Sequence, residues 1–213
     1  IDLLAEFLEK SDDRNTGKVY PGISPRGMMA LWDGDFAMGG EDFIELLSRV
    51  LRYSHNLQDP RYIGHQCCPP LPAAALSGLV GALINNASAV YEMGPVNVAM
   101  EQRLIGWMAG LAGYGDGAGG VFTHGGTLGN LTAMLAARQV QCGYDIWKEG
   151  YRNSEPLAVL VSANCHYSVK RAAAVMGLGE DAVYTVPVDG DFRLDPSRLE
   201  EVYGRAAEDG RRP

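Results

Sequence analysis

Apolar side chains recur every three or four residues over most of the first 111 residues, which predicts a succession of helices. The segments with this spacing are residues 1–10, 41–53, 73–85 and 96–111. We expect the more apolar ones to be core and interface helices. Residues 11–25 are polar and contain proline, so we expect an extended arm that lies against something else. Prolines also bracket residues 61–67, which predicts a rigid extended connection there.

From residue 115 onward the pattern changes to short apolar runs that alternate with helical spacing. Residues 121–123, 157–162 and 182–188 are predicted strands, and residues 157–162 form the continuous apolar run that is typical of a buried parallel strand. Helices are predicted to follow them, with Thr127, Ser168 and Asp195 as N-caps. This order predicts an α/β fold with a doubly wound, mostly parallel sheet and flanking helices. Another strand is due where the given residues stop, so we expect a longer or nicked polypeptide.

Composition and charge exclude several classes of protein. The 213 residues include 18 basic and 26 acidic side chains, a net charge of −8, and the basic residues form no dense patch. Nucleic acid is therefore not an expected partner. No apolar run reaches about 18 residues, so no membrane span is expected. Four cysteines, two of them adjacent, suit a reducing cytoplasm. His65 beside Cys67 and Cys68 lacks zinc-site spacing, so no metal is expected.

Gly125, Gly126 and Thr127 stand between a predicted strand and a predicted helix. Glycine allows a tight turn and close backbone approach, and the helix directs free N–H groups at whatever lies over the turn. An anion, most often a phosphate, suits that position. Neither common nucleotide-binding glycine motif is present. A simple tight turn is the alternative interpretation.

His166 follows the predicted strand at residues 157–162 and precedes a predicted helix. In parallel α/β sheets, ligands bind at the carboxyl ends of the strands, so His166 is expected near Gly126 and Thr127. The alternative is a surface histidine that only helps to start the helix.

Three blocks in the same order resemble one protein family. The segment GVFTHGGTLGNLTAMLAAR is similar to a TSGGTEANLTALLAAR-type stretch, and HYSVKRAAAVMGLG is similar to an HYSVKKAARLLGLG-type stretch. The segments DPRYIGHQ and EMGPVNVAMEQRLIGWMAGLAG resemble a third conserved pattern. The family is the group II pyridoxal-phosphate-dependent amino-acid decarboxylases, which include the aromatic-amino-acid and glutamate decarboxylases.

The resemblance implies a fold of the aspartate aminotransferase type (fold type I), of which only the N-terminal part is present. It implies a homodimer with its sites at the subunit interface. Residues 1–72 would then be an N-terminal helical arm and extended segment that makes dimer contacts. Residues 73–213 would be the first half of the cofactor-binding α/β domain. The remainder of the polypeptide would complete that domain.

The resemblance also assigns the site. Pyridoxal 5'-phosphate would be the cofactor, with its phosphate held by Gly125, Gly126 and Thr127 and its ring stacked on His166, which also helps with proton handling. The reaction implied is loss of the α-carboxylate of an L-amino acid as carbon dioxide, leaving an amine, with the cofactor as electron sink. The Schiff-base lysine and the ring-nitrogen aspartate belong to later family segments, so the given residues alone are expected to be inactive. A carbon–carbon lyase of the sphingosine-phosphate type, or a non-catalytic subunit of this fold, is the alternative.

His65, Gln66 and Cys68 match the family's substrate wall. His65 and Gln66 make this wall polar, which favours a polar or aliphatic amino acid over an aromatic one and leaves the particular amino acid open. Alternatively, the two side chains satisfy backbone groups in a tight turn. The sequence departs from the family at His124, which replaces a small residue, and at Leu128 and Gly129, which replace Glu-Ala.

Overall fold

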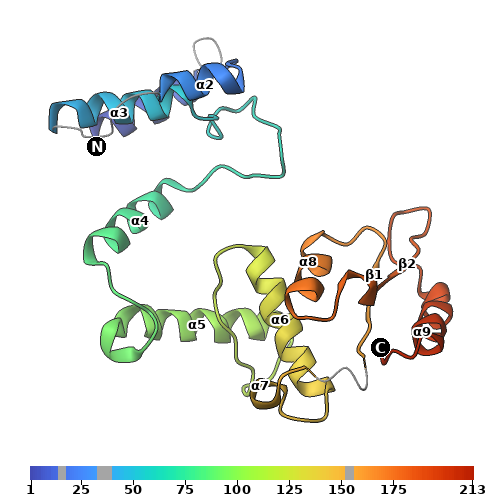
Figure 1. The fold of residues 1–213 in the computed structure, drawn as a ribbon. Helices are drawn as coiled ribbons and strands as arrows, with labels where there is room; N and C mark the ends of the chain where they lie inside the picture. The colour runs from blue at the N-terminus through green and yellow to red at the C-terminus, as the bar shows by residue number, and fades with distance from the viewer. Residues whose placement is uncertain (14–17, 33–39, 152–155) are drawn as a thin grey trace. The chain divides into compact units, whose positions relative to one another are not determined.

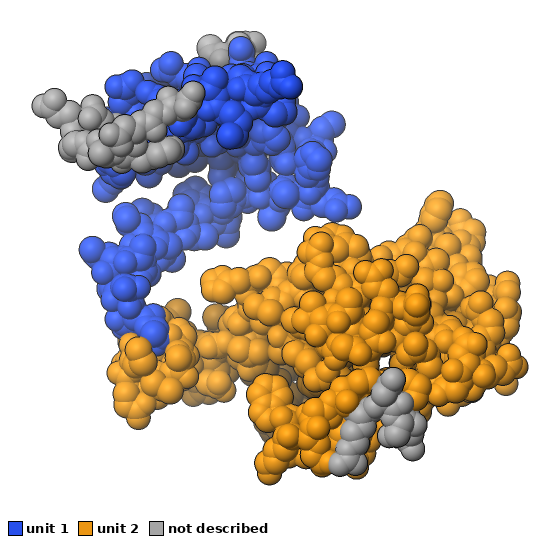
Figure 2. Space-filling view, viewed as in Figure 1, with its two compact units in different colours: residues 1–87 blue, residues 88–213 orange. Residues whose placement is uncertain are grey.

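The computed structural model describes residues 1–13, 18–32, 40–151 and 156–213. They form two compact units, residues 1–87 and residues 88–213 (Figure 2), which are described separately below. The expected boundary after residue 72 rests on the family's domain plan, and it stays a prediction.

The first unit contains four described helices (Figure 1): α1 (Asp2–Ser11), α2 (Pro25–Leu31), α3 (Gly40–Tyr53) and α4 (Pro72–Ile84). Three of them confirm the helices predicted from apolar spacing. Helix α2 was not predicted. Its signal is local, because Ser24 accepts a hydrogen bond from the backbone N–H of Gly27 and Pro25 occupies the first turn.

Polar contacts fix the loop that follows α3. Asn56 is buried and donates to the hydroxyl of buried Ser11 at 2.9 Å, which ties this loop to the end of α1. The side chain of Asp59 is fully buried and accepts from the guanidinium of Arg61 at 2.7 Å. The hydrogen bond with Asp59 raises the pKa of Arg61. The contacts of Asn56 and Asp59 therefore fix the loop that leads into residues 61–67, the segment predicted to be extended.

The prediction that residues 61–67 are extended throughout is wrong. Two consecutive non-glycine residues, His65 and Gln66, have φ values of 52° and 55° and turn the chain. The Cys67 thiol donates to the carbonyl oxygen of His65 at 3.3 Å. Left-handed conformations are strained and uncommon for non-glycine residues. A pattern of apolar residues and prolines therefore gives no sign of this turn.

The second unit contains the remaining described elements (Figure 1). Its helices are η1 (Tyr91–Met93), α5 (Pro95–Leu111), α6 (Gly126–Gln141), α7 (Ile146–Glu149), α8 (Ser168–Val175), η2 (Glu180–Ala182), η3 (Pro196–Arg198) and α9 (Leu199–Glu208). Its strands are β1 (Val159–Ser162) and β2 (Val183–Val186). Apart from the short helices and small differences at the ends, the order matches the predicted alternation after residue 125.

The two strands pair in parallel, as predicted, with Val159 opposite Val183. Helix α8 lies between them in sequence. Arg212 forms a parallel bridge with Leu157 just before β1. The N–H of Ala158 donates to Arg212, whereas the N–H of Ala163 donates to Val186 of β2. Successive N–H groups of a strand point to alternate edges, so Arg212 and β2 lie on opposite edges of the β1 segment.

Residues 121–123 do not form a strand in the structure, which corrects the prediction for this segment. No described neighbour pairs with its backbone in a ladder. The N–H of Phe122 instead donates to the carboxylate of Glu101 on α5, at 2.9 Å. The β-propensity of three residues is too weak to form a strand without a partner backbone.

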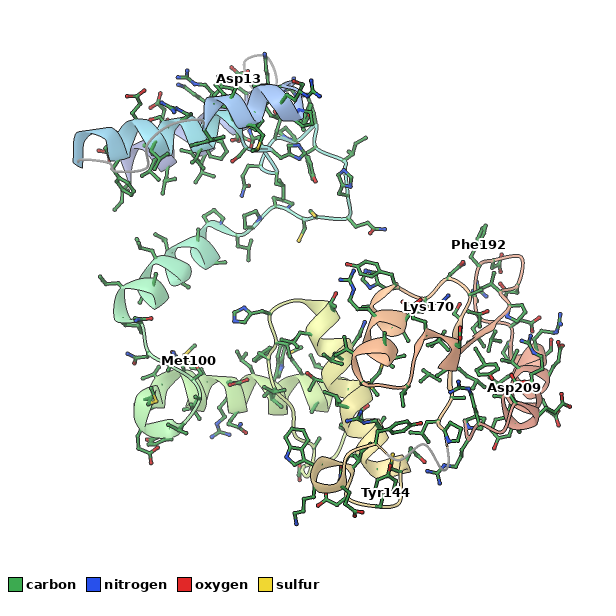
Figure 3. The ribbon with its side chains drawn as sticks, in the orientation of Figure 1. Asp13, Met100, Tyr144, Lys170, Phe192 and Asp209 are labelled. Carbon is green, nitrogen blue, oxygen red and sulfur yellow. The ribbon has the colours of Figure 1, made fainter. Side chains whose placement is uncertain are left out.

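The core of the second unit lies among α6, α8 and the strands. Its buried members are Cys142, Ile146, Leu157, Ala172, Ala173, Met176, Leu178 and Ala182. Helix α9 packs on β2 through Val202 and Ala206, which are fully buried. Figure 1 shows α8 and α9 on opposite sides of the strand pair. The hydroxyl of Tyr184 donates to Asp209 (labelled in Figure 3), at the end of α9, at 2.6 Å.

No helix within the described residues is both long and apolar enough to cross a membrane.

The start of the short helix η3, which leads into α9, depends on the charge of Asp195. Asp195 therefore caps η3, and the prediction that it caps α9 is corrected. Its carboxylate accepts hydrogen bonds from the hydroxyl and the N–H of Ser197, which hold its pKa below the usual value. A lowered pKa adds stability that is present above the unfolded-state value of about 3.9 and is lost as pH falls through the folded-state value. We therefore expect the amide of Ser197 to lose hydrogen-exchange protection in acid. Asp195→Asn, an uncharged cap, should abolish that pH dependence; an unchanged profile would contradict the assignment.

Candidate functional site

The turn before α6 has a backbone conformation that only glycine adopts readily. Gly125 has φ 83° and ψ 156°, a region that a Cβ makes strongly unfavourable. Thr123 fixes the turn twice, because its carbonyl accepts from the N–H of Gly125 at 3.0 Å and its hydroxyl donates to the carbonyl of Gly125 at 3.2 Å. The first glycine of the predicted anion-binding turn is therefore required by backbone geometry.

The N-terminus of α6 is open to a ligand. Gly125 is the N-cap and supplies no side chain, so Thr127 is a helical residue and the prediction that it caps the helix is wrong. The first N–H that bonds within the helix is that of Gly129, which donates to Gly125 at 3.3 Å. The N–H groups of Gly126, Thr127 and Leu128 have no acceptor within the helix. No acidic residue lies in this first turn, so its positive dipole end suits a phosphate.

Glu101 on α5 anchors the segment that leads into this turn. Its bond to Phe122 places residues 121–123 beside α5. A Cβ on Gly120 would lie only 3.2 Å from the side chain of Ile105, which is also on α5. Sequence reasoning missed Glu101, although it lies in one of the three family-like blocks. A glutamate on a helix carries no local sign that it accepts from a loop N–H.

Removal of this anchor should weaken anion binding at the turn. We expect Glu101→Ala to lower the affinity for pyridoxal phosphate about two- to tenfold, the range of one net hydrogen bond. Glu101→Gln keeps an acceptor oxygen and should lose less. Titration of the cofactor-free, full-length protein measures both affinities. Equal losses in the two variants would show that charge, and not the anchor to Phe122, matters.

His166 lies in the loop between β1 and α8, and hydrogen bonds connect it to the first turns of α6. Its Nδ1 lies 2.8 Å from the hydroxyl of Ser168, and Asn130 of α6 donates to the same hydroxyl at 2.8 Å. The ring of Tyr167 lies 4.2 Å from the imidazole, centroid to centroid. Tyr167 is the N-cap of α8, so the prediction for Ser168 is corrected: Ser168 is the first helical residue and is fully buried.

The structure thus brings His166 and the start of α6 into one hydrogen-bonded region, as the topology predicted. Asn130 lies four residues after Gly126, about one turn into the helix. Sequence reasoning missed Asn130 and Ser168 as links between the two parts. Neither residue shows this role in its own segment.

The other predicted site residues, His65, Gln66 and Cys68, belong to the unit of residues 1–87. All three side chains are exposed there. The half-buried Tyr62 precedes the turn, and its ring lies 3.6 Å from the position of a Cβ on Gly64. Burial and the neighbouring Cys67 raise the pKa of the Tyr62 hydroxyl. The role of the three residues as a substrate wall stays a prediction.

The departures from the family pattern have different structural settings. A Cβ on Gly129 would lie 3.3 Å from the hydroxyl oxygen of Thr123, so the threonine that fixes the turn favours glycine here. His124 is exposed immediately before Gly125. Its role toward an anion stays a hypothesis.

A family model identifies the fold to which this arrangement belongs. The model described as "Pyridoxal-dependent decarboxylase conserved domain" matches residues 65–213, which include the glycine turn, α6 and His166. The chain belongs to the pyridoxal-dependent decarboxylase family. The cofactor of this family is pyridoxal phosphate, in agreement with the cofactor that the resemblance implied.

Curated relatives of the decarboxylase family agree with this assignment. The chain is 34% identical to cysteine sulfinic acid decarboxylase of Homo sapiens over 92% of its own length and 40% of that protein. It is 29% identical to acidic amino acid decarboxylase GADL1 of Xenopus tropicalis, over 99% and 41% of the two chains. It is also 29% identical to L-2,4-diaminobutyrate decarboxylase of Acinetobacter baumannii, over 91% and 41%. The chain therefore spans about two fifths of these relatives.

Solved structures confirm the fold. Mouse CSAD in apo form superposes with a TM-score of 0.87 at 30% identity, over all of this chain and 46% of that one. Oryza sativa TDC with PLP and tryptamine gives 0.79 at 20% identity, over 98% and 47% of the two chains. The fold is thus the α/β fold of the pyridoxal-dependent decarboxylases, of which this chain matches somewhat less than half.

Proposed function

We propose that the full-length protein is a pyridoxal-phosphate-dependent decarboxylase that removes the α-carboxylate of an L-amino acid. The main observation behind the proposal is that two features lie in one region that hydrogen bonds connect. One is the glycine-only turn that opens α6, and the other is His166, joined to α6 through Ser168 and Asn130. The names of the three curated relatives favour decarboxylation over carbon–carbon cleavage or a non-catalytic role.

The residues present fit the cofactor's phosphate. Gly125 turns the backbone without a side chain, and nothing lies within 4 Å of the position of a Cβ on either Gly125 or Gly126. An anion can therefore approach the free N–H groups of Gly126 and Thr127, and the Thr127 hydroxyl is available as a further donor. These groups bind the phosphate end and thereby fix the position of the ring.

His166 would orient the other end of the cofactor and handle a proton. Its imidazole offers a flat face for stacking and a second nitrogen, Nε2, for proton transfer. When bound, pyridoxal phosphate supplies the electron sink that makes loss of carbon dioxide possible. The chain's own contribution is to hold phosphate and ring in a fixed relation, through the bonds from α6 to Ser168 and His166. The lysine and aspartate of later family segments would complete the site.

We propose a small polar amino acid, and an acidic one first, as the substrate. Two of the three curated relatives carry the name of an acidic substrate or substrate class. His65 and Gln66 present polar groups in an exposed turn held in a strained conformation, and strained residues cluster at functional sites. Cys68 would complete this wall.

We also propose that the protein works as a homodimer whose site lies at the subunit interface. Helices α4 and α5 each carry apolar side chains that are exposed within their own unit. On α5 they are Val96, Met100 (labelled in Figure 3), Leu104, Trp107, Met108 and Leu111. Such apolar faces are usually buried in complete, assembled proteins. Here they would be buried against the remainder of the polypeptide and a second subunit. Light scattering on the full-length protein should give the mass of two subunits, and a monomeric active enzyme would contradict the proposal.

A cytoplasmic location is part of the same proposal. All four cysteines are free, which suits a reducing compartment.

Decarboxylation assays on the purified full-length protein with added pyridoxal phosphate test the function. The substrates should be cysteine sulfinate, aspartate, glutamate, 2,4-diaminobutyrate and tryptophan. Carbon dioxide and the product amine should be measured for each. We expect turnover of an acidic amino acid to exceed that of tryptophan by at least about a hundredfold, the selectivity that unpaired buried polar groups can impose.

Three results would overturn parts of the proposal. Formation of an aldehyde without carbon dioxide would favour the carbon–carbon lyase. Preference for tryptophan would refute the polar substrate wall while leaving decarboxylation intact. A protein that takes up no pyridoxal phosphate would favour the non-catalytic alternative.

A further inference from the structure

The hydrogen bonds around Nδ1 of His166 have a fixed direction. The backbone N–H of Ser168 points at Nδ1 at 3.3 Å, and the hydroxyl of Ser168 lies 2.8 Å from the same nitrogen. A backbone N–H donates and cannot accept. Nδ1 is therefore an acceptor, and a proton on it would oppose the N–H of Ser168.

Asn130 orients the hydroxyl of Ser168 so that its proton can point to Nδ1 of His166. Its amide nitrogen donates to the hydroxyl oxygen at 2.8 Å. A hydroxyl has one proton and two acceptor lone pairs, so it can accept from Asn130 and donate its proton to Nδ1, which the N–H of Ser168 requires to be an acceptor. Ser168 is fully buried, and these two bonds satisfy its hydroxyl. The resulting series of hydrogen bonds runs from the Asn130 amide through the Ser168 hydroxyl to the imidazole.

We propose that Asn130 and Ser168 hold the neutral imidazole of His166 in the tautomer that carries its proton on Nε2. They are positioning residues, because they act through His166. Nε2–H is then the group that the imidazole offers as a donor to whatever occupies the site. The tautomer follows from the chain's own bonds, and its value for catalysis rests on the proposed function.

Asn130→Asp should reverse the direction of the hydrogen bond between residue 130 and Ser168. A carboxylate can only accept, so the hydroxyl of Ser168 would turn its proton toward the introduced carboxylate and leave a lone pair facing Nδ1. We expect the fraction of His166 protonated on Nδ1 to rise at least about fivefold, in line with one net hydrogen bond. Asn130 is exposed, so the variant should fold. Gln102→Glu, on the exposed surface of α5, adds the same charge in the same unit and should change nothing.

Nitrogen-15 spectra of histidine-labelled, cofactor-free, full-length protein measure the tautomer directly. They should be recorded at a pH where imidazole is neutral, with the His166 signals assigned by their loss in His166→Gln. We expect the wild type to show protonated Nε2 and unprotonated Nδ1. In Ser168→Ala the Nδ1 signal should shift toward that of a nitrogen with a weaker partner. Should that variant fail to fold, the wild-type and Asn130→Asp spectra decide.

The possible outcomes separate the inference from the proposed function. A wild-type protein with protonated Nδ1, or an even mixture of tautomers, overturns the inference whatever the cofactor does. An unchanged spectrum in Asn130→Asp also overturns it. The predicted spectra in a protein that binds no pyridoxal phosphate would uphold the tautomer and refute the function. If both hold, Asn130→Asp should lower kcat about fivefold or more and change cofactor affinity less than about twofold, again the scale of one net hydrogen bond.

Discussion

Gly125→Ala should lower the affinity of the full-length protein for pyridoxal phosphate by about tenfold to a hundredfold. Gly125 has φ 83° and ψ 156°, and a non-glycine residue there costs about 1–3 kcal/mol, where each 1.4 kcal/mol equals a factor of ten. The backbone would relax to avoid the strain, so the free N–H groups at the start of α6 would no longer converge on one anion. Titration of cofactor-free protein, followed by cofactor absorbance, measures the loss.

Two further glycine variants separate strain from other effects. Gly204 lies within α9, where nothing is within 4 Å of an added Cβ, so Gly204→Ala should leave cofactor affinity unchanged. Gly126→Ala has no strained φ, and any loss of affinity would come from contact with the phosphate itself. An unchanged affinity in Gly125→Ala would refute the assigned role of the turn.

His166→Phe should lower kcat by about a hundredfold to a thousandfold, within the range for loss of a positioned acid or base. The phenyl ring retains a flat face, so cofactor affinity should change by no more than about threefold. His166→Ala removes the face as well, and its affinity should fall a further two- to tenfold, about the worth of an aromatic pair. Steady-state kinetics and cofactor titration on the full-length protein give the two numbers for each variant.

His55→Phe provides a matched control for the histidine variants. His55 lies in the unit of residues 1–87, where its ring meets that of Tyr20 edge-on at 5.0 Å, a contact that phenylalanine can keep. Its kcat and affinity should remain those of the wild type. Equal kcat in His166→Phe and wild type would limit His166 to stacking.

Local signals explain why much of the second unit was predictable. Helical spacing of apolar residues acts within a few residues, so α5, α6, α8 and α9 matched their predicted segments. Strand β1 lies in a continuous apolar run and β2 is rich in valine and tyrosine, and their parallel pairing follows from the helix between them. The proximity of His166 to α6 was predicted although the strand expected before α6 is not formed, because α6 packs against α8.

The wrong N-caps, Thr127 and Ser168, are errors of one or two residues at the starts of helices that do form. Other errors concern features that depend on distant partners. Phe122 has strand propensity, but Glu101 takes its N–H and no described strand pairs with it. The link from Asn130 to Ser168 depends on how α6 packs against α8, which neither segment encodes alone. His65 and Gln66 adopt positive φ without being glycine, and neither residue type marks that conformation in the sequence. Local patterns therefore predict elements and their order better than they predict the contacts that complete a site.

Because Arg212 pairs with Leu157 just before β1, the β1 segment lies between β2 and the residues that follow α9. From β1 the chain passes through α8 to β2 on one edge, then returns through α9 to the opposite edge. The connections on the two sides of β1 thus run in opposite directions, which makes β1 a topological switch point. Crevices in open α/β sheets form outside the carboxyl end of such a strand. Ser162 ends β1, and His166 follows four residues later, so the path of the backbone alone places this histidine just beyond the carboxyl end of the switch-point strand.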